Sequence, residues 1–302
     1  MIEIIDLTKR YHKKKESIQA LDHISLTVRD SEILGLIGMN GAGKTTTLKI
    51  LSGLIIPDDG VVKINDVEVV NNKRCLRSGV GLLTGEFTRS LYWRLTGRQN
   101  LVFFANLRNM WNPDNRINEL LRLFDLEQYA DEQVMKYSTG MKHKLSLITG
   151  LLDDPQILLL DEPLTGIDPA TAFMIKRIVR EQFRGKTIIW ASHNLYEVEE
   201  MCDRIALIHK GKILFVGTPN EIKKAYGWYT KIIVVCDKPD KFSLFQNAVV
   251  TGSTVTVQTD DVHSDIERIV RFAEDQGIRI QSIQTVQPSL EEIFMKVVNN
   301  AR

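Results

Sequence analysis

The sequence contains few cysteines and no long apolar run. Its 302 residues include three cysteines, Cys75, Cys202 and Cys236, and none belongs to a Cys-x-x-Cys pair. This spacing predicts neither a disulfide framework nor a zinc site, and it favours a reducing compartment. The apolar runs are short stretches such as Ile157 to Leu160, whereas a membrane-spanning helix needs about 20 apolar residues. We therefore expect a chain that does not cross a membrane by itself.

An excess of charge of either sign is also missing. The 39 Lys and Arg residues and the 38 Asp and Glu residues give a formal net charge of +1. A nucleic-acid-binding protein normally carries a basic face, so this balance weakens that function class without excluding it. Met1 to Asp6 contains acids where a secretion signal has a basic region, and we expect no such signal. The length and the ordinary globular composition predict about two domains.

Short apolar runs alternate with longer helical patterns, which predicts an α/β fold with a mostly parallel sheet. A hairpin is expected over 60–69, turning at Asn65 and Asp66. Between about 88 and 153 the strand signal disappears, which indicates a helical insertion. After Gly227 the pattern changes to that of a small α/β domain over 228–302, with a closing helix over 289–298. The strands expected in the core sheet are 32–37, 79–83, 157–160, 187–191 and 205–209.

The segment from Gly38 to Thr45 reads Gly-Met-Asn-Gly-Ala-Gly-Lys-Thr and matches the phosphate-loop pattern G-x-x-x-x-G-K-[ST]. It lies between an apolar strand and a helical pattern, which is the context that the motif requires. Glycines let successive N–H groups point at phosphate oxygens, and the helix N-terminus adds partial positive charge. The pattern predicts that Lys44 binds the β- and γ-phosphates and that the Thr45 hydroxyl ligates Mg²⁺. The predicted nucleotide-binding residues of this loop are Gly38, Asn40, Gly41, Gly43, Lys44, Thr45 and Thr46.

A second apolar strand, Ile157 to Leu160, ends in two carboxylates, Asp161 and Glu162. Open α/β sheets bind ligands at the carboxyl ends of their strands. Together with the phosphate loop, this predicts that Asp161 orients Mg²⁺ and that Glu162 acts as general base or positions the attacking water.

Between these two elements lies Tyr137-Ser-Thr-Gly-Met-Lys142, which resembles the signature sequence of ABC transporters, usually L-S-G-G-Q. The order of the motifs along the chain is also that of an ABC ATP-binding cassette. It runs from a strand and the phosphate loop through the helical insertion, the signature and the acidic strand to a Gly-Ile-Asp168 turn and Ala191-Ser-His193. The resemblance covers about residues 1–227. It implies the fold of a P-loop NTPase with an antiparallel β subdomain, and ATP hydrolysis by a dimer of cassettes with ATP sandwiched between phosphate loop and opposing signature.

The resemblance also implies roles for single residues. It implies that Tyr11 stacks on adenine, although a plain hairpin tyrosine is almost equally compatible. Ser138 and Gly140 are expected to contact the γ-phosphate bound by the other protomer, whereas the residues alone predict a helix cap at Ser138. Asp168 before Pro169 is a helix start in itself, and the family adds a contact across the dimer. His193 resembles the histidine that hydrogen-bonds the γ-phosphate.

The sequence departs from the family pattern at two places. No glutamine follows the strand 79–83, so either Glu86 takes that place near the metal or the ligand is absent. The signature has Tyr137, Thr139 and Met141 in place of Leu, Gly and Gln. With the Pro-Ser-Leu-Glu-Glu-Ile-Phe segment at 288–294, these features resemble the type-2 exporter branch, which acts in sodium, drug or antibiotic export.

The resemblance implies a permease on a separate chain, a second copy of the cassette, no nucleic acid, and a cytoplasmic position at the inner face of the membrane. We expect the aromatic residues Phe87, Tyr92 and Trp93 to receive a short helix of that permease, unless they belong to the core. The competing class is a soluble ABC ATPase that acts on nucleic acid or ribosomes. A catalytically inactive cassette is disfavoured because Lys44, Asp161, Glu162 and His193 are all present.

Overall fold

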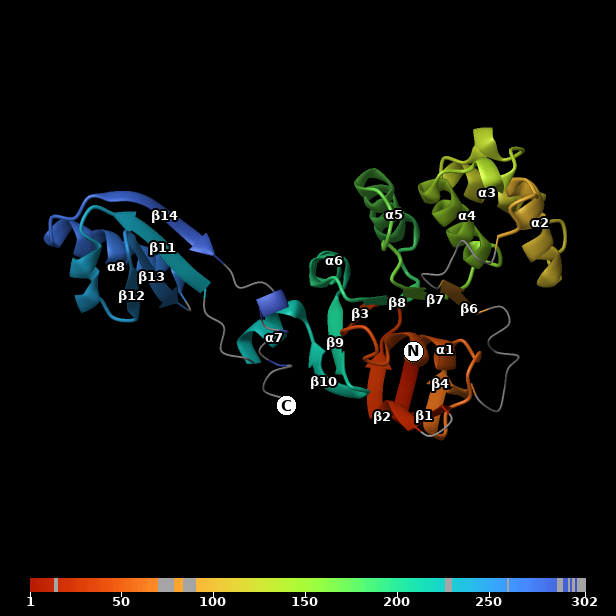
Figure 1. Cartoon of the computed structure of the whole chain (residues 1–302), viewed down its shortest axis with the longest axis horizontal. Coiled ribbons are helices and arrows are strands. Elements are labelled where there is room, and N and C mark those ends of the chain that lie inside the picture. Colours follow the sequence, from red (N-terminus) through yellow and green to blue (C-terminus); the bar gives the residue numbers. More distant parts are fainter. Residues whose placement is uncertain are drawn as a thin grey trace. The chain divides into compact units, whose positions relative to one another are not determined.

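The computed structural model (Figure 1) describes residues 1–13, 16–69, 79–83, 91–225, 230–259 and 261–286, together with positions 290–292, 294 and 297. The chain divides into two compact units, Met1–Thr218 and Pro219–Arg302. Among the described residues, no helix combines the length and the apolar character needed to cross a bilayer.

A six-stranded sheet forms the centre of the first unit, in the order β10-β9-β3-β8-β7-β6. Five of its strands are parallel, and β10 pairs antiparallel with β9. Every residue of β7 and β8 is buried, as the two-sided helical cover of a parallel sheet requires. The strands are β3 (Ile33–Ile37), β6 (Val80–Leu83), β7 (Ile157–Asp161), β8 (Thr187–Ser192), β9 (Arg204–His209) and β10 (Lys212–Gly217).

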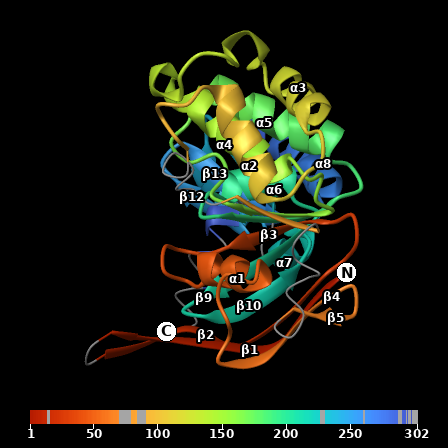
Figure 2. The ribbon, with the colours of Figure 1, turned by 90° about the vertical axis from the view of Figure 1, so that its right-hand side faces the viewer.

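A second, antiparallel sheet lies below the first in Figure 2, and α1 (Lys44–Leu51) lies between the two. One apolar core joins the layers: Ile4 of β1 and Leu159 of β7 belong to the same buried cluster as Leu48 of α1. This sheet has the order β2-β1-β4-β5. Its strands are β1 (Ile2–Lys13), β2 (Glu16–Val28), β4 (Asp59–Ile64) and β5 (Val67–Glu68).

Helices cover the other face of the core sheet (Figure 2). A helical insertion follows β6 in the chain and contains α2 (Gly97–Leu107), α3 (Asp114–Leu123), two short 3-10 turns, η3 (Glu127–Tyr129) and η4 (Val134–Lys136), and α4 (Thr139–Leu151). The α2 start is a capping box in which Thr96 and Gln99 satisfy each other's backbone N–H groups. The remaining helices are α5 (Pro169–Gln182) and α6 (Leu195–Met201).

The second unit has its own core. Its sheet, in the order β12-β13-β11-β14, is packed around Phe242, whose ring lies 5.2 Å from that of Phe272 between centroids. The elements are α7 (Pro219–Ala225), β11 (Thr230–Cys236), η5 (Pro239–Leu244), β12 (Ala248–Thr251), β13 (Thr254–Thr259), α8 (Val262–Asp275) and β14 (Ile280–Val286).

The predicted fold class is confirmed: a mostly parallel core sheet, an antiparallel β subdomain and helical segments are present. The expected strands agree with β3, β6, β7, β8 and β9 to within one residue at each end. The boundary between the compact units falls after Thr218, so α7 is grouped with the second unit. Glu86, Phe87 and Cys75 lie outside the described residues, and of the closing helix only positions 290–292, 294 and 297 are described, all helical.

Candidate functional site: a phosphate loop facing two acids and a histidine

The phosphate loop joins β3 to the start of α1, and two of its glycines have backbone conformations that other residues rarely adopt. Gly41 has φ +80° and Gly43 has φ +115°. A Cβ on Gly43 would also lie 2.7 Å from the carbonyl oxygen of Ala20. The loop therefore depends on glycine for its path, and the first amides of α1 have no side-chain cap. Uncapped amides at a helix N-terminus are available to an anion.

Lys44 folds back into this loop. Its side chain is buried, and Nζ donates a 2.6 Å hydrogen bond to the carbonyl oxygen of Gly38. Nζ also lies 3.3 Å from Glu162 Oε1, as an ion pair without the alignment of a hydrogen bond. The cation is thus held at the mouth of the loop between a carbonyl and a carboxylate, and a phosphate group is a stronger partner than either.

The two acids at the end of β7 have different surroundings. Asp161 is buried, and its Oδ2 accepts a 2.7 Å hydrogen bond from the Thr45 hydroxyl. Burial raises the pKa of Asp161 above its ordinary value, although the Thr45 bond opposes this shift. Within the described part of the chain, Asp161 Oδ1 is buried without a hydrogen-bond partner. An unpaired buried carboxylate oxygen is costly, so its retention here indicates a ligand that the acid serves.

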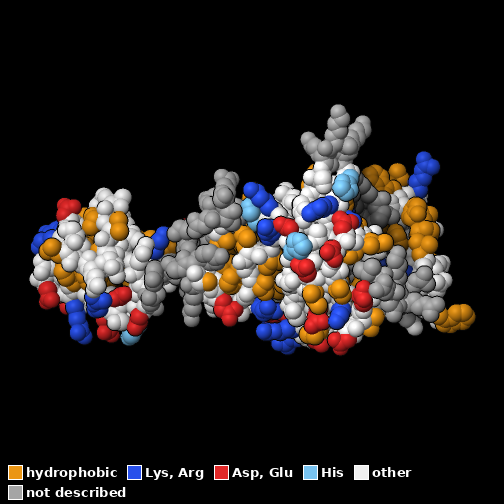
Figure 3. Space-filling view, turned by 90° about the horizontal axis from the view of Figure 1, so that it is seen from below, with side chains coloured by type: hydrophobic (Ala, Val, Ile, Leu, Met, Phe, Trp, Pro, Cys, Tyr) orange, Lys and Arg blue, Asp and Glu red, His pale blue; other side chains and the backbone are white. Residues whose placement is uncertain are grey.

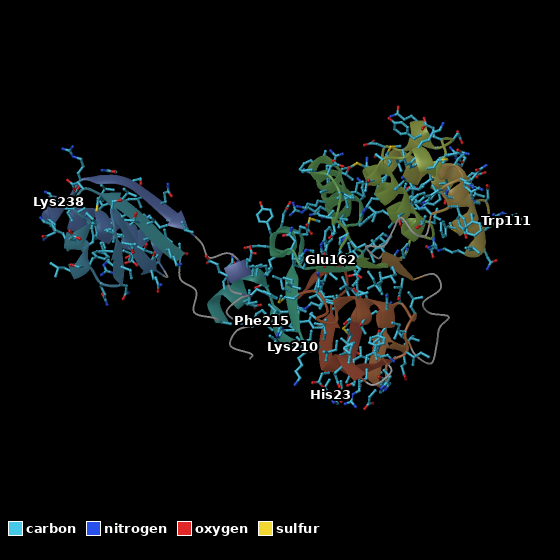
Figure 4. All side chains as sticks on the ribbon, in the orientation of Figure 1. His23, Trp111, Glu162, Lys210, Phe215 and Lys238 are labelled. Carbon is cyan, nitrogen blue, oxygen red and sulfur yellow. The ribbon has the colours of Figure 1, made fainter. Side chains whose placement is uncertain are left out.

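Glu162 lies at the boundary between the core sheet and the helices above it (Figure 4). Its carboxylate has two further partners besides Lys44: His193 Nδ1 lies 2.7 Å from Oε2, and the Thr165 hydroxyl donates to Oε2 at 3.2 Å. Since a carboxylate only accepts, Nδ1 of His193 carries the hydrogen in this contact. The next residue, Asn194, caps α6 through its side chain and thereby fixes the turn that presents His193.

The structure therefore brings the phosphate loop, Asp161, Glu162 and His193 together from the ends of three parallel strands. Tyr11 also lies near this loop, with its hydroxyl 3.5 Å from the Thr46 hydroxyl. Its ring is partly exposed, which leaves both the adenine-stacking and the plain hairpin interpretation open.

The predicted signature residues lie elsewhere in the chain. Ser138 caps α4, where its Oγ accepts from the Met141 amide, and Asp168 caps α5 through the Thr171 amide and hydroxyl. Gly140 is packed so closely that a Cβ there would lie 2.9 Å from Thr171 Oγ1. The hydrogen bonds that Ser138 and Asp168 make through their side chains lie at their own helix ends.

Two residues at the site were not predicted from the sequence. Thr165 follows Glu162 by three residues, a spacing that could have suggested its contact with that carboxylate. His143, on α4, hydrogen-bonds the carbonyl of Pro163 at 2.7 Å. Nothing in the local sequence indicates this contact, because the two residues meet only through the packing of α4 on the core sheet.

A parallel sheet with a glycine loop between strand and helix, a buried lysine in that loop and two acids at the end of another strand of the sheet defines a P-loop protein that binds nucleoside triphosphates. The comparison with known proteins is more specific. Residues 21–165 match the family model of the ABC transporter, and residues 217–298 match that of the C-terminal domain of DrrA1-3-like ATP-binding proteins.

The full chain has relatives of similar length. It is 32% identical over 97% of its residues to the daunorubicin resistance ATP-binding protein DrrA3 of Streptomyces coeruleorubidus, covering 94% of that protein. It is 34% identical over 72% of its residues to the ABC transporter ATP-binding protein NatA of Bacillus subtilis (strain 168), covering 89% of it. Among solved structures, a dimer of the ATP-binding cassette MJ0796 with ADP and Pi matches 72% of this chain and 98% of its own, with TM-score 0.65 and 24% identity. The chain belongs to the family of ABC transporter ATP-binding proteins and is an ATPase of that family.

Proposed function

We propose that the chain hydrolyses ATP with Lys44, Glu162 and His193 as its working groups and powers a membrane exporter. The observation that carries the proposal is the contact of one carboxylate, Glu162, with both the phosphate-loop lysine and His193. The γ-phosphate of ATP displaces Glu162 as the partner of Lys44. The freed carboxylate then accepts a proton from a water molecule whose oxygen attacks the γ-phosphorus, and the bond to the β-phosphate oxygen breaks to release ADP.

His193 holds Glu162 in place through Nδ1 and presents its second ring nitrogen toward the phosphates. These two roles of His193 agree with a histidine that is half-exposed beside a carboxylate that is mostly buried. The Thr165 hydroxyl supports the same Glu162 oxygen. In this proposal neither residue takes the proton of the water, because Glu162 is the acceptor that faces Lys44 at the phosphate loop.

The donor set fits Mg²⁺ as the accompanying cation. Thr45 and Asp161 would hold it, since Mg²⁺ prefers oxygen ligands and is usually bound through one or two carboxylates together with phosphate oxygens and waters. The unpaired Oδ1 of Asp161 is the observation that supports this assignment. Within the described residues, no cluster of three acids, histidines or cysteines offers a complete protein site for a metal ion, which agrees with a cation that arrives with the nucleotide. When bound, Mg²⁺ neutralises charge on the transferred phosphoryl group.

The functional unit in this proposal is a pair of cassettes. Ser138, Gly140 and Asp168 of one copy would contact the nucleotide held by the phosphate loop of the other, with Tyr11 against adenine. Support comes from the N-terminus of α4, which begins directly after Ser138 and carries the partial positive charge of a helix start, and from the dimeric state of the MJ0796 cassette.

A permease on another chain is the second proposed partner, with the cassette at the cytoplasmic face of the membrane and a drug or antibiotic as cargo. The relatives named above support the cargo class. Tyr92 and Trp93 are about half exposed and form a candidate contact surface for the permease. On the face drawn in Figure 3, Lys and Arg are interspersed with Asp and Glu, which does not favour a nucleic-acid partner. We expect a neighbouring gene to encode a protein with about six apolar stretches of roughly 20 residues; a neighbourhood without one counts against the permease.

The test of the proposal is steady-state ATP hydrolysis by wild type and Lys44→Ala. Loss of the phosphate-loop cation is expected to lower the rate by about 100-fold or more, since electrostatic groups at a reacting centre contribute on that scale. Lys241→Ala is the matched control, because Lys241 is exposed and donates to the Gln276 carbonyl within the second unit. Equal rates in wild type and Lys44→Ala would remove the assignment.

A further inference from the structure

Glu162 has a backbone conformation that residues with a side chain seldom adopt. Its φ is +53°, in the left-handed region, although it is neither glycine nor asparagine. Such a conformation persists only where the surrounding structure holds it, and it directs the side chain away from the course of the preceding strand. Two backbone bonds hold the turn: the Glu162 amide donates to the carbonyl of Ala191 on the adjacent strand β8 at 2.8 Å, and the Thr165 amide donates to the carbonyl of Glu162 at 3.2 Å.

A third contact holds this turn from outside. Pro163 follows Glu162 and has no N–H group, so its carbonyl is its one backbone hydrogen-bonding group. His143 Nε2 lies 2.7 Å from that carbonyl oxygen, and both partners are buried. Because a carbonyl only accepts, Nε2 carries the hydrogen. Burial lowers the pKa of His143, which agrees with a neutral ring in this position.

His143 belongs to a different element from the turn that it holds. It lies on α4, five residues after Ser138 at the N-cap, whereas Pro163 follows the end of β7. The helix also contacts the start of α5 at Gly140, next to Asp168 and Thr171. The conformation of Glu162 is therefore fixed partly by the turn itself and the adjacent strand β8, and partly by the helix that carries the signature residues.

We propose that His143 is a positioning residue for the general base: its Nε2–H group holds the Pro163 carbonyl and so keeps Glu162 in the conformation that faces Lys44 and His193. This inference rests on the proposed role of Glu162. A histidine that serves only to fill space between α4 and the sheet predicts a loss of stability on substitution, with no specific effect on the chemical step.

The experiment compares His143→Gln with His143→Met in the full-length protein. Glutamine places an N–H donor at about the position of Nε2, whereas methionine has similar length and no donor. We expect the His143→Met variant to have a kcat about 10-fold to 100-fold below that of wild type, as a small misplacement of a reacting group does, while its Kd for ATP changes less than about threefold. The kcat of His143→Gln is expected to lie within about threefold of wild type. An unchanged kcat in His143→Met, or an equal loss of kcat in both variants, would overturn the proposal.

Two further measurements keep the inference testable. If His143→Met unfolds below the assay temperature, His143→Asn takes its place, because the shorter amide folds as a polar residue but does not reach Pro163; its kcat should fall below that of Gln. Single-turnover rates of Glu162→Gln with and without His143→Met should agree within about twofold, since a residue acting through Glu162 has no further effect once that carboxylate is gone. If His143→Met lowers the rate of Glu162→Gln by the same factor as it lowers that of wild type, the result contradicts this expectation. If Glu162→Gln itself leaves hydrolysis unchanged, the proposed function fails; if only the His143 variants are neutral, that function stands and this inference fails.

Discussion

The buried carboxylate of Asp161 shows how function and stability oppose each other at a single residue. One of its oxygens accepts from Thr45, and the other has no partner among the described residues. Burial raises its pKa, so its ionised form is disfavoured in the folded protein. Asp154 is the opposite case: a hydrogen bond from Lys186 holds the pKa of its carboxyl below the ordinary value.

Asp161→Asn is therefore expected to stabilise the nucleotide-free protein by about 1 kcal/mol while abolishing hydrolysis. The penalty of the ionised acid is complete above its raised pKa and disappears as the pH falls below the ordinary value of 3.8. Asp154→Asn should destabilise instead, because its stabilising ionised form is present above 3.8 and is lost as the pH falls through the lowered pKa. Urea unfolding of both variants from neutral to acid pH measures this opposition. A destabilised Asp161→Asn protein would contradict the account.

At the scale of elements, the contact between α2 and the signature explains one departure from the family pattern. Tyr137 stands where the family has leucine, and its buried hydroxyl donates to the Tyr129 carbonyl at 2.7 Å. Burial raises the pKa of Tyr137 to about 12. The larger ring fits because the facing residue of α2 is Gly97, where a Cβ would lie 2.2 Å from the Tyr137 hydroxyl oxygen.

Gly97→Ala is expected to destabilise the protein by about 1–3 kcal/mol through overpacking. Tyr137→Phe alone should cost about 1 kcal/mol for the lost hydrogen bond. In the double variant the severe clash with the hydroxyl oxygen is removed, and the next atom of the ring lies 3.2 Å from the added Cβ, a tight contact that a small shift relieves. The combined loss should therefore be smaller than the sum by about 1–2 kcal/mol. Urea unfolding of the three variants measures the coupling, and strict additivity would show that the two residues do not meet.

The core strands and the phosphate loop could be predicted from the sequence because local patterns determine them. β3, β7 and β8 are short apolar runs, and the loop glycines are required by φ angles that few other residues adopt. The contacts of Glu162 could not be predicted in the same way. The residues around this carboxylate come from separate elements: Lys44, His193, and Pro163 with its partner His143. They meet only because of the register of β3, β7 and β8 and the packing of α4.

At the scale of the whole molecule, the chain has two hydrophobic cores, one in each compact unit. The first unit contains the phosphate loop together with Asp161, Glu162 and His193, and the second is stabilised by its own cluster around Phe242. Ser138 and Asp168 lie in the first unit and cap their own helices, and Gly140 packs against the start of α5. In the proposed dimer each copy offers half of each ATP site, and the account requires two copies.

The most direct test of this central claim is the mass of Glu162→Gln in solution with and without ATP, measured by light scattering. This variant keeps the phosphate loop but loses the proposed base, so hydrolysis should fall by about 10²–10⁴-fold and ATP should remain bound. The account predicts a monomer of 34.4 kDa without nucleotide and twice that mass with ATP. Ser138→Arg in the same background, which blocks the α4 N-terminus, should prevent the doubling. Hydrolysis by Glu162→Gln at the wild-type rate, or a monomer at saturating ATP, would contradict it.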